Sequence, residues 1–177
     1  MNISVPARRL PSPVRALFSR ATLADPNTPL LALAAVSFVG HMLVAGNYGY
    51  FRDELYYLMD GRHLQLGYVD QPMLMGLLSA LINLVARDNL IAIHVLPALC
   101  AASIVVVTGL IARELGGGRF AQILAALAAL FALVFMATGS IFSMDVIDEL
   151  CWAVGTLILV RLLKRDEPRL WLAFGLV

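Results

Sequence analysis

Long apolar stretches separated by short polar segments dominate the chain after residue 29. Four of them have the length of a membrane span, at residues 30–48, 89–112, 120–138 and 146–163. About 20 apolar residues in a helix are needed to cross the roughly 30 Å hydrocarbon core of a bilayer. The pattern therefore predicts an all-α fold, a polytopic transmembrane helical bundle that occupies residues 29–177.

A fifth apolar stretch opens at residue 170 and reaches the last residue, Val177. Its helix would be only about 12 Å long, and a helix that ends inside lipid leaves backbone carbonyls without partners. We therefore expect a truncated fifth span, and we expect the sequence to be the N-terminal part of a longer protein.

The composition agrees with a membrane location. Hydrophobic residues make up 60% of the chain and charged residues 14%, and the mean hydropathy is +0.84. A soluble domain has about 45–50% apolar and about 25% charged residues. The net charge of +1 gives no support for nucleic acid as a partner.

The orientation in the membrane depends on residues 72–86, which are apolar but reach only about 22 Å as a helix. If this segment lies flat in the interface, most arginines and lysines share one side of the membrane and most acids the other. The excess of basic residues on the cytoplasmic side of membrane proteins therefore favours a flat segment. We expect residues 1–28 to be a disordered cytoplasmic tail, and the acids to face outward from a bacterial inner membrane.

Two acidic clusters then share the external side. In the first, Asp53 and Glu54 lie among apolar residues at helical spacing, which predicts an amphipathic interfacial helix with both carboxylates pointing away from its apolar stripe. Tyr57 lies one turn after Asp53. The second cluster is on one helical face at the start of the fourth span, and it comprises Asp145, Asp148 and Glu149.

Each cluster has a structural and a functional interpretation. The first pair could be solvated loop charges, and the second could only stabilise a helix N-terminus. Convergent carboxylates beside the membrane can instead supply a general base or bind a divalent cation. Asp70 has the same two interpretations, as part of a site or as the cap of the helix that follows it. Residue types and spacing leave these alternatives open.

The residues around the first acidic pair resemble a known family. The run YFRDELYYL at residues 50–58, followed by GYVDQP at residues 67–72, resembles the first external loop of GT-C membrane glycosyltransferases. These are the protein mannosyltransferase and aminoarabinose transferase relatives, similar to glycosyltransferase family 39. Ser143-Met144-Asp145 resembles their later external acidic motif, and the resemblance covers about residues 30–177.

The resemblance implies inverting transfer of a sugar from a polyprenyl-phosphate donor to a lipid, glycan or protein acceptor on the non-cytoplasmic side. It implies a catalytic role for Asp53, Glu54 and Asp145, with Asp53 as the base or as a ligand of a divalent metal ion. The donor and acceptor would then meet the substrate-binding candidates Arg52, Tyr57, Asp70 and Gln71.

Arg52 adjoins Asp53, so it could contact the donor phosphate or simply pair with the neighbouring carboxylates. Gln71 stands where aminoarabinose transferases have a basic residue, and Met73 replaces the second proline that is common in the family. The first of these departures argues against aminoarabinose as the sugar.

Two other functions compete with the enzyme. A transporter also carries ionisable residues in its membrane helices, but they typically lie near the bilayer midplane on broken helices, whereas these acids gather at one face. A non-catalytic membrane subunit would tolerate the neutralisation of Asp53, which an enzyme that uses this carboxylate would not.

Overall fold

The computed structural model describes residues 25, 27–87, 89–165 and 167–177. The predicted disordered tail, apart from Asp25, Asn27 and Thr28, lies outside these residues. The helices are α3 (Thr28–Val44), α4 (Arg52–Arg62), α5 (Leu74–Ala86), α6 (Leu90–Glu114), α7 (Arg119–Leu130), α8 (Leu133–Thr138), α9 (Met144–Leu162) and α10 (Pro168–Leu176). Within the described residues, the only β-type pairing is an isolated bridge between Gly67 and Pro72. The prediction of an all-α fold is confirmed.

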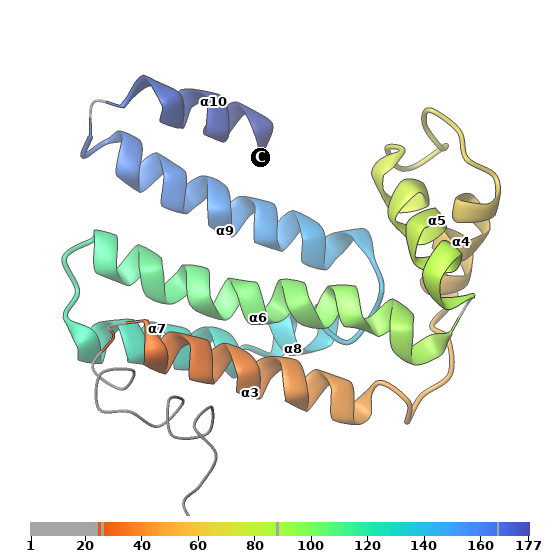
Figure 1. Cartoon of the computed structure of the whole chain (residues 1–177), viewed down its shortest axis with the longest axis horizontal. Coiled ribbons are helices and arrows are strands. Elements are labelled where there is room, and N and C mark those ends of the chain that lie inside the picture. Colours follow the sequence, from red (N-terminus) through yellow and green to blue (C-terminus); the bar gives the residue numbers. More distant parts are fainter. Residues whose placement is uncertain (1–24, 26, 88, 166) are drawn as a thin grey trace, which may run out of the picture.

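Helix α6 is the centre of the bundle. It packs against α3, α7 and α9, and α10 packs on the outer side of α9, so that the long helices run side by side (Figure 1). With 25 residues, α6 is about 38 Å long. In the described part of the chain, it is the one helix both long and apolar enough to cross a bilayer.

The other predicted spans are shorter or more polar than α6. Helix α3 ends at Val44, and the predicted span 120–138 is divided into α7 and α8 because Ala132 adopts an extended conformation between them. Helix α9 has 19 residues, but three carboxylates lie in its first two turns. Whether each of these helices crosses the bilayer stays a prediction.

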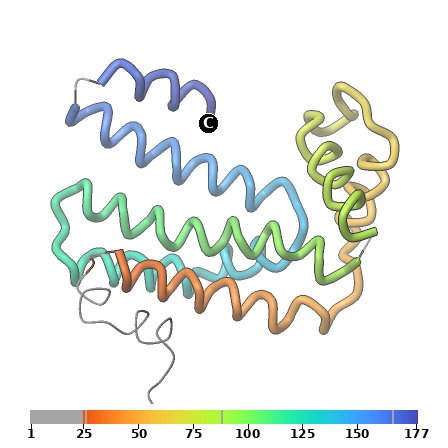
Figure 2. Tube along the Cα trace, in the orientation of Figure 1, coloured from red at the N-terminus to blue at the C-terminus, as the bar shows by residue number. Residues whose placement is uncertain are grey.

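Helices α4 and α5 form a hairpin that stands across one end of the bundle, where α3 finishes and α6 begins (Figures 1 and 2). The two helices approach closely because Gly61 has no side chain: a Cβ there would lie 2.5 Å from the Ser79 hydroxyl oxygen. Helix α5 does not run alongside the long helices (Figure 1), which is the geometry expected of a helix that lies flat in the interface.

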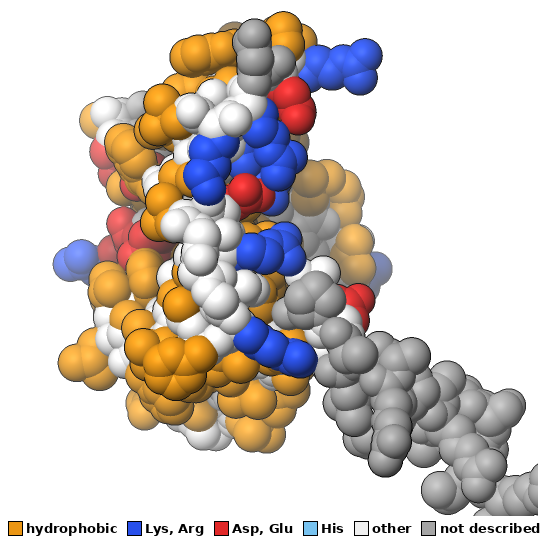
Figure 3. Space-filling model, turned by 90° about the vertical axis from the view of Figure 1, so that its left-hand side faces the viewer, with side chains coloured by type: hydrophobic (Ala, Val, Ile, Leu, Met, Phe, Trp, Pro, Cys, Tyr) orange, Lys and Arg blue, Asp and Glu red, His pale blue; other side chains and the backbone are white. Residues whose placement is uncertain are grey.

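Charged residues are sorted between the two ends of the bundle. Lysines and arginines gather at the end opposite the hairpin (Figure 3), in and beside the turns that join α6 to α7 and α9 to α10. These residues are Arg113, Arg119, Arg161, Lys164, Arg165 and Arg169. Glu114 accepts a hydrogen bond from Arg161 there, with 2.8 Å between Nε and Oε1. The hairpin end carries most of the described acids, namely Asp53, Glu54, Asp60, Asp70, Asp145, Asp148 and Glu149.

Candidate functional site

The site begins with the first turn of α4. Phe51 is extended and precedes the helix, and its backbone N–H donates to Oε2 of Glu54 over 2.8 Å. A glutamate at the third helical position that reaches back to the N-cap N–H is half of a capping box. This local bond fixes the start of α4 and turns Glu54 toward the chain that precedes the helix.

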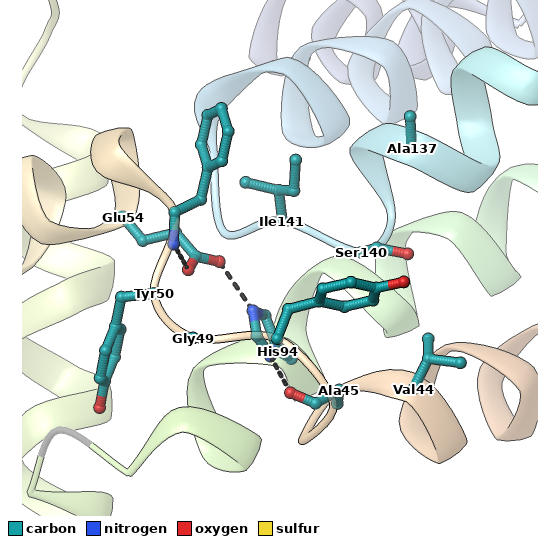
Figure 4. Close-up of a pocket in the computed structure, with 11 residues that line it drawn as sticks. Val44, Ala45, Gly49, Tyr50, Glu54, His94, Ala137, Ser140 and Ile141 are labelled. Atoms are coloured by element: carbon teal, nitrogen blue, oxygen red, sulfur yellow. Dashed lines mark hydrogen bonds and ion pairs between the residues drawn. The ribbon is translucent and has the colours of Figure 1, made fainter.

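Glu54 lies in the protein interior. Only 1% of it is exposed, and its Oε1 accepts a hydrogen bond from the Phe142 backbone N–H over 2.8 Å. The same oxygen lies 2.7 Å from Nε2 of His94 on α6 (Figure 4). The interpretation of Glu54 as a solvated loop charge is therefore wrong, because donors from α6 and from the α8–α9 loop hold the carboxylate in the core.

The surroundings of Glu54 favour its ionised form. Burial acts to raise the pKa of this carboxyl, but the hydrogen bonds from His94, Phe142 and Phe51 outweigh burial and lower the pKa. Since both oxygens already accept bonds from the protein, Glu54 is poorly placed to take a proton from a substrate.

Asp53 has the opposite environment. Its side chain is 44% exposed and lies 3.0 Å from Nε of Arg52, whose own side chain is 88% exposed. An ion pair between exposed groups is weak, so a substrate can compete for either partner. The Asp53 carboxylate is thus partly open to solvent, and Arg52 has both a carboxylate partner and access to solvent.

Tyr57 connects the helix of Asp53 with the segment of Asp145. Its ring stands edge-on to Phe142, with 6.1 Å between the ring centroids, and it forms a hydrogen bond with the backbone of Met144. Burial raises the pKa of the Tyr57 phenol, and the negative charges of Asp145 and Asp53 raise it further. The two acidic clusters, about 90 residues apart in the sequence, therefore meet around one buried tyrosine.

Asp145 lies in the first turn of α9, where the helix N-terminus favours a negative charge. Its Oδ2 accepts a hydrogen bond from the Ser143 hydroxyl over 3.0 Å. Asp145 and Asp148 line a cavity of about 330 Å³ between α9 and the start of α5. Glu149 instead accepts a hydrogen bond from Thr138 on α8, so the predicted acidic face is shared between a cavity and a helix contact.

Asp70 and Gln71 hold the loop between α4 and α5. Oδ1 of Asp70 accepts a hydrogen bond from the Tyr56 hydroxyl over 2.7 Å, which is the main reason that the pKa of Tyr56 is raised to about 12. The buried amide of Gln71 donates to Asp60. The interpretation of Asp70 as a helix cap is wrong, because α5 begins at Leu74 without a side-chain cap.

Sequence reasoning missed His94. It is buried in α6, with Nδ1 3.1 Å from the Ala45 carbonyl oxygen and Nε2 facing Glu54. A histidine within an otherwise apolar span was the available signal, but its partners are 40 or more residues away. The other histidine of this kind, His41, contacts the Ser140 hydroxyl.

A second cavity, of about 350 Å³, lies beside the His94–Glu54 contact. It is lined by the end of α3, the chain leading to α4, and residues of α8 and the α8–α9 loop, and its surface is mostly apolar (Figure 4). Tyr48, Tyr50 and Phe51 form its aromatic side. Aromatic residues are enriched at membrane interfaces, so this cavity suits an apolar group more than a charged one.

A divalent metal ion at Asp53 finds little support in the side chains nearby. Over residues 25, 27–87, 89–165 and 167–177, no group of three or more His, Cys, Asp or Glu residues is arranged to hold a metal ion. Asp53 could contribute a single carboxylate, and its Oδ1 already pairs with Arg52. The described residues therefore do not fit a complete metal site.

Comparison with known proteins identifies a family. The family model described as dolichyl-phosphate-mannose-protein mannosyltransferase matches residues 70–177, which is more than half of the chain and includes Asp70, Gln71 and Asp145. The Asp53-Glu54 pair precedes the matched region. No curated protein and no solved structure matches the chain.

Proposed function

The chain belongs to the dolichyl-phosphate-mannose-protein mannosyltransferase family of membrane glycosyltransferases, and from this premise we propose that it builds part of an external active site. In this proposal, a sugar passes from a polyprenyl-phosphate donor to a lipid, glycan or protein acceptor on the non-cytoplasmic side of a bacterial inner membrane. The observation that carries the proposal is the meeting of the Asp53 and Asp145 segments around Tyr57.

The charge distribution supports the external side. Six basic residues lie at the end of the bundle opposite α4 and α5, and basic loops are retained in the cytoplasm. The hairpin end, with its exposed aromatic and aliphatic side chains, then lies at the outer headgroup region. Exposed Phe51, Leu55 and Met59 follow one another at helical spacing along α4, as expected of a helix that rests on lipid.

Asp53 is the proposed general base. Its exposed carboxylate would accept the proton from an acceptor hydroxyl while the hydroxyl oxygen forms a bond to the anomeric carbon of the donor sugar. The bond between that carbon and the lipid phosphate breaks at the same time, and its electron pair leaves with the phosphate oxygen. Attack from the face opposite the leaving group inverts the configuration at the carbon.

Arg52 and Asp145 have supporting roles in this proposal. The exposed guanidinium of Arg52 can neutralise the charge that develops on the departing phosphate. Asp145 lines a cavity next to the Tyr57 contact, where its carboxylate could accept hydrogen bonds from sugar or acceptor hydroxyls. Tyr57 and Gln71 are buried, so we propose that they shape the site and do not contact the donor directly.

The first prediction concerns Asp53. Asp53→Asn in the complete enzyme should lower transfer from a polyprenyl-phosphate sugar by about 10²–10⁴-fold, the usual contribution of general base catalysis. Expression and membrane insertion should survive, because the side chain is exposed and makes only a weak ion pair. Transfer of radiolabelled sugar in isolated membranes measures the effect.

Asp25→Asn is the matched control, since Asp25 is an exposed carboxylate beside the start of α3 at the opposite end of the bundle. It should transfer sugar at the wild-type rate. Normal turnover by Asp53→Asn would remove Asp53 from the reaction. Addition of EDTA to the wild-type assay tests the metal alternative, and we expect transfer to persist.

A further inference from the structure

The two neighbours Asp53 and Glu54 lie in different environments, and only the second joins remote parts of the chain. We infer that Glu54 and His94 are positioning residues, which together hold the Asp53-bearing helix α4 in register with the segment that presents Asp145. The inference rests on the proposed function, because it assigns how the two acidic segments of that site are kept together.

Glu54 contacts three segments through its two oxygens. Oε2 accepts from Phe51, which precedes α4, while Oε1 accepts from the Phe142 N–H over 2.8 Å and faces His94 over 2.7 Å. These partners are separated from Glu54 by 3, 88 and 40 residues. Glu54 is 1% exposed and both of its oxygens already accept hydrogen bonds from the protein. It therefore connects segments of the chain and is not accessible to a substrate.

His94 adds a fourth segment. The Ala45 carbonyl oxygen only accepts hydrogen bonds, so Nδ1, which lies 3.1 Å from it, carries a proton. The contact between Nε2 and Glu54 Oε1 requires one further proton, and because Glu54 is ionised, Nε2 carries this proton. With that proton, the His94 ring connects the Ala45 carbonyl at the end of α3 with Glu54 on α4. Removal of either His94 or Glu54 would leave the other side chain buried without its hydrogen-bond partner.

Phe142 links the Glu54 contacts to the segment that carries Asp145. Its backbone N–H is bonded to Glu54, and its side chain, which is 1% exposed, packs against Tyr57. Phe142 lies three residues before Asp145, and the Tyr57 hydroxyl also contacts the backbone of Met144. Loss of the Glu54 bond would therefore free the α8–α9 loop at the point where it meets α4, and would alter the separation of Asp53 and Asp145.

The test compares four variants of the full-length enzyme in lipid nanodiscs. Glu54→Gln places an amide donor opposite existing donors, and His94→Phe removes both ring nitrogens. His94→Gln keeps one N–H that can reach Glu54, so it serves as the conservative variant. Asp53→Asn is the control that removes the proposed base without touching the buried contacts.

Two quantities are measured, both per amount of folded protein. Amide hydrogen exchange of peptides covering residues 139–144 should be at least tenfold faster in Glu54→Gln and His94→Phe, and unchanged in Asp53→Asn. The turnover number for sugar transfer should fall about tenfold or more in the first two variants, with the donor KM within about threefold of wild type. His94→Gln should restore part of both losses.

The outcomes separate the positioning role from the alternatives. Wild-type exchange and turnover in His94→Phe would overturn the inference, as would complete loss of transfer in Glu54→Gln with unchanged exchange, which would make Glu54 a reacting group. If His94→Phe fails to fold, His94→Gln and Glu54→Gln decide the matter by the same criteria. Full activity in Asp53→Asn would refute the proposed base alone, because the exchange measurement does not depend on it.

Discussion

At the scale of single residues, the acidic pair of α4 shows how two adjacent carboxylates acquire different properties. Successive residues of a helix project about 100° apart, so Asp53 and Glu54 cannot both face the core. Glu54 faces the side on which His94 and the Phe142 N–H supply donors, and it is buried, while Asp53 keeps an exposed partner in Arg52. Two adjacent carboxylates thus have different roles: Asp53 is the candidate base, and Glu54 joins separate segments inside the protein.

The lowered pKa of Glu54 predicts a pH dependence of stability. Because the folded-state pKa lies below the ordinary value of a glutamate carboxyl, the unfolded chain takes up this proton first as the pH falls. The stabilising contribution is therefore complete above about pH 5, and is lost as the pH falls through the folded-state pKa. The midpoint of thermal unfolding of the purified protein, measured from pH 6 downward, should show this loss.

Glu54→Gln cannot titrate, so its unfolding midpoint should fall less steeply over the same acid range. At neutral pH the variant should be the less stable protein. Parallel curves for the wild type and Glu54→Gln below pH 5 would show that this carboxyl does not contribute to the acid sensitivity.

At the scale of helices, close approaches at glycine set how the bundle packs. A Cβ on Gly109 of α6 would lie 2.5 Å from a terminal methyl carbon of Leu30 on α3. Leu30 is itself 1% exposed and packs with Val105, Ala126 and Ala129, so it has little room to move. The contact between α3 and α6 therefore depends on the missing side chain at residue 109.

We predict that Gly109→Ala lowers the free energy of unfolding by about 1–3 kcal/mol, the usual cost of overpacking. Gly40→Ala on α3 is the matched control, since a Cβ added there would have no neighbouring atom within 4 Å. It should be neutral or stabilising by up to about 1 kcal/mol, because alanine is the better helix former. Thermal unfolding in one detergent compares the two, and equal midpoints would contradict the role of Gly109.

At the scale of the whole molecule, the sorting of charge between the two ends gives the protein its expected orientation. The basic residues gather at one end (Figure 3), and the α4–α5 hairpin lies at the other (Figure 1), where most of the described acids are found. An active site that uses a lipid-linked sugar must lie at headgroup depth on the side where that donor is presented. The orientation therefore decides whether Asp53 can meet its substrate.

Single cysteines test the orientation, and the structure guides where to place them. Gly61 and Gly117 are unsuitable, because a Cβ at either would collide with neighbouring atoms. Leu66 is 93% exposed in the α4–α5 loop, and a Cβ at Gly118 would meet nothing within 4 Å. In a background with Cys100→Ala and Cys151→Ala, an impermeant maleimide added to intact cells should label Leu66→Cys but not Gly118→Cys.

Permeabilised cells provide the control, because both cysteines should then react. The opposite labelling pattern in intact cells would put the hairpin in the cytoplasm. Asp53 would then lie on the wrong side of the membrane for the proposed transfer.

Features that depend on local pattern could be predicted from the amino-acid sequence. Helical periodicity and the length of apolar runs predicted an all-α membrane bundle. The positions of charged residues between the apolar runs predicted that most basic residues lie at one end of the bundle and most acids at the other. Tertiary structure alone decided that Glu54 is buried against His94 and Phe142, that Asp70 holds Tyr56, and that residues 120–138 form two helices. The physical reason is that the burial of a carboxylate depends on which donors surround it, and here those donors come from segments up to 88 residues away.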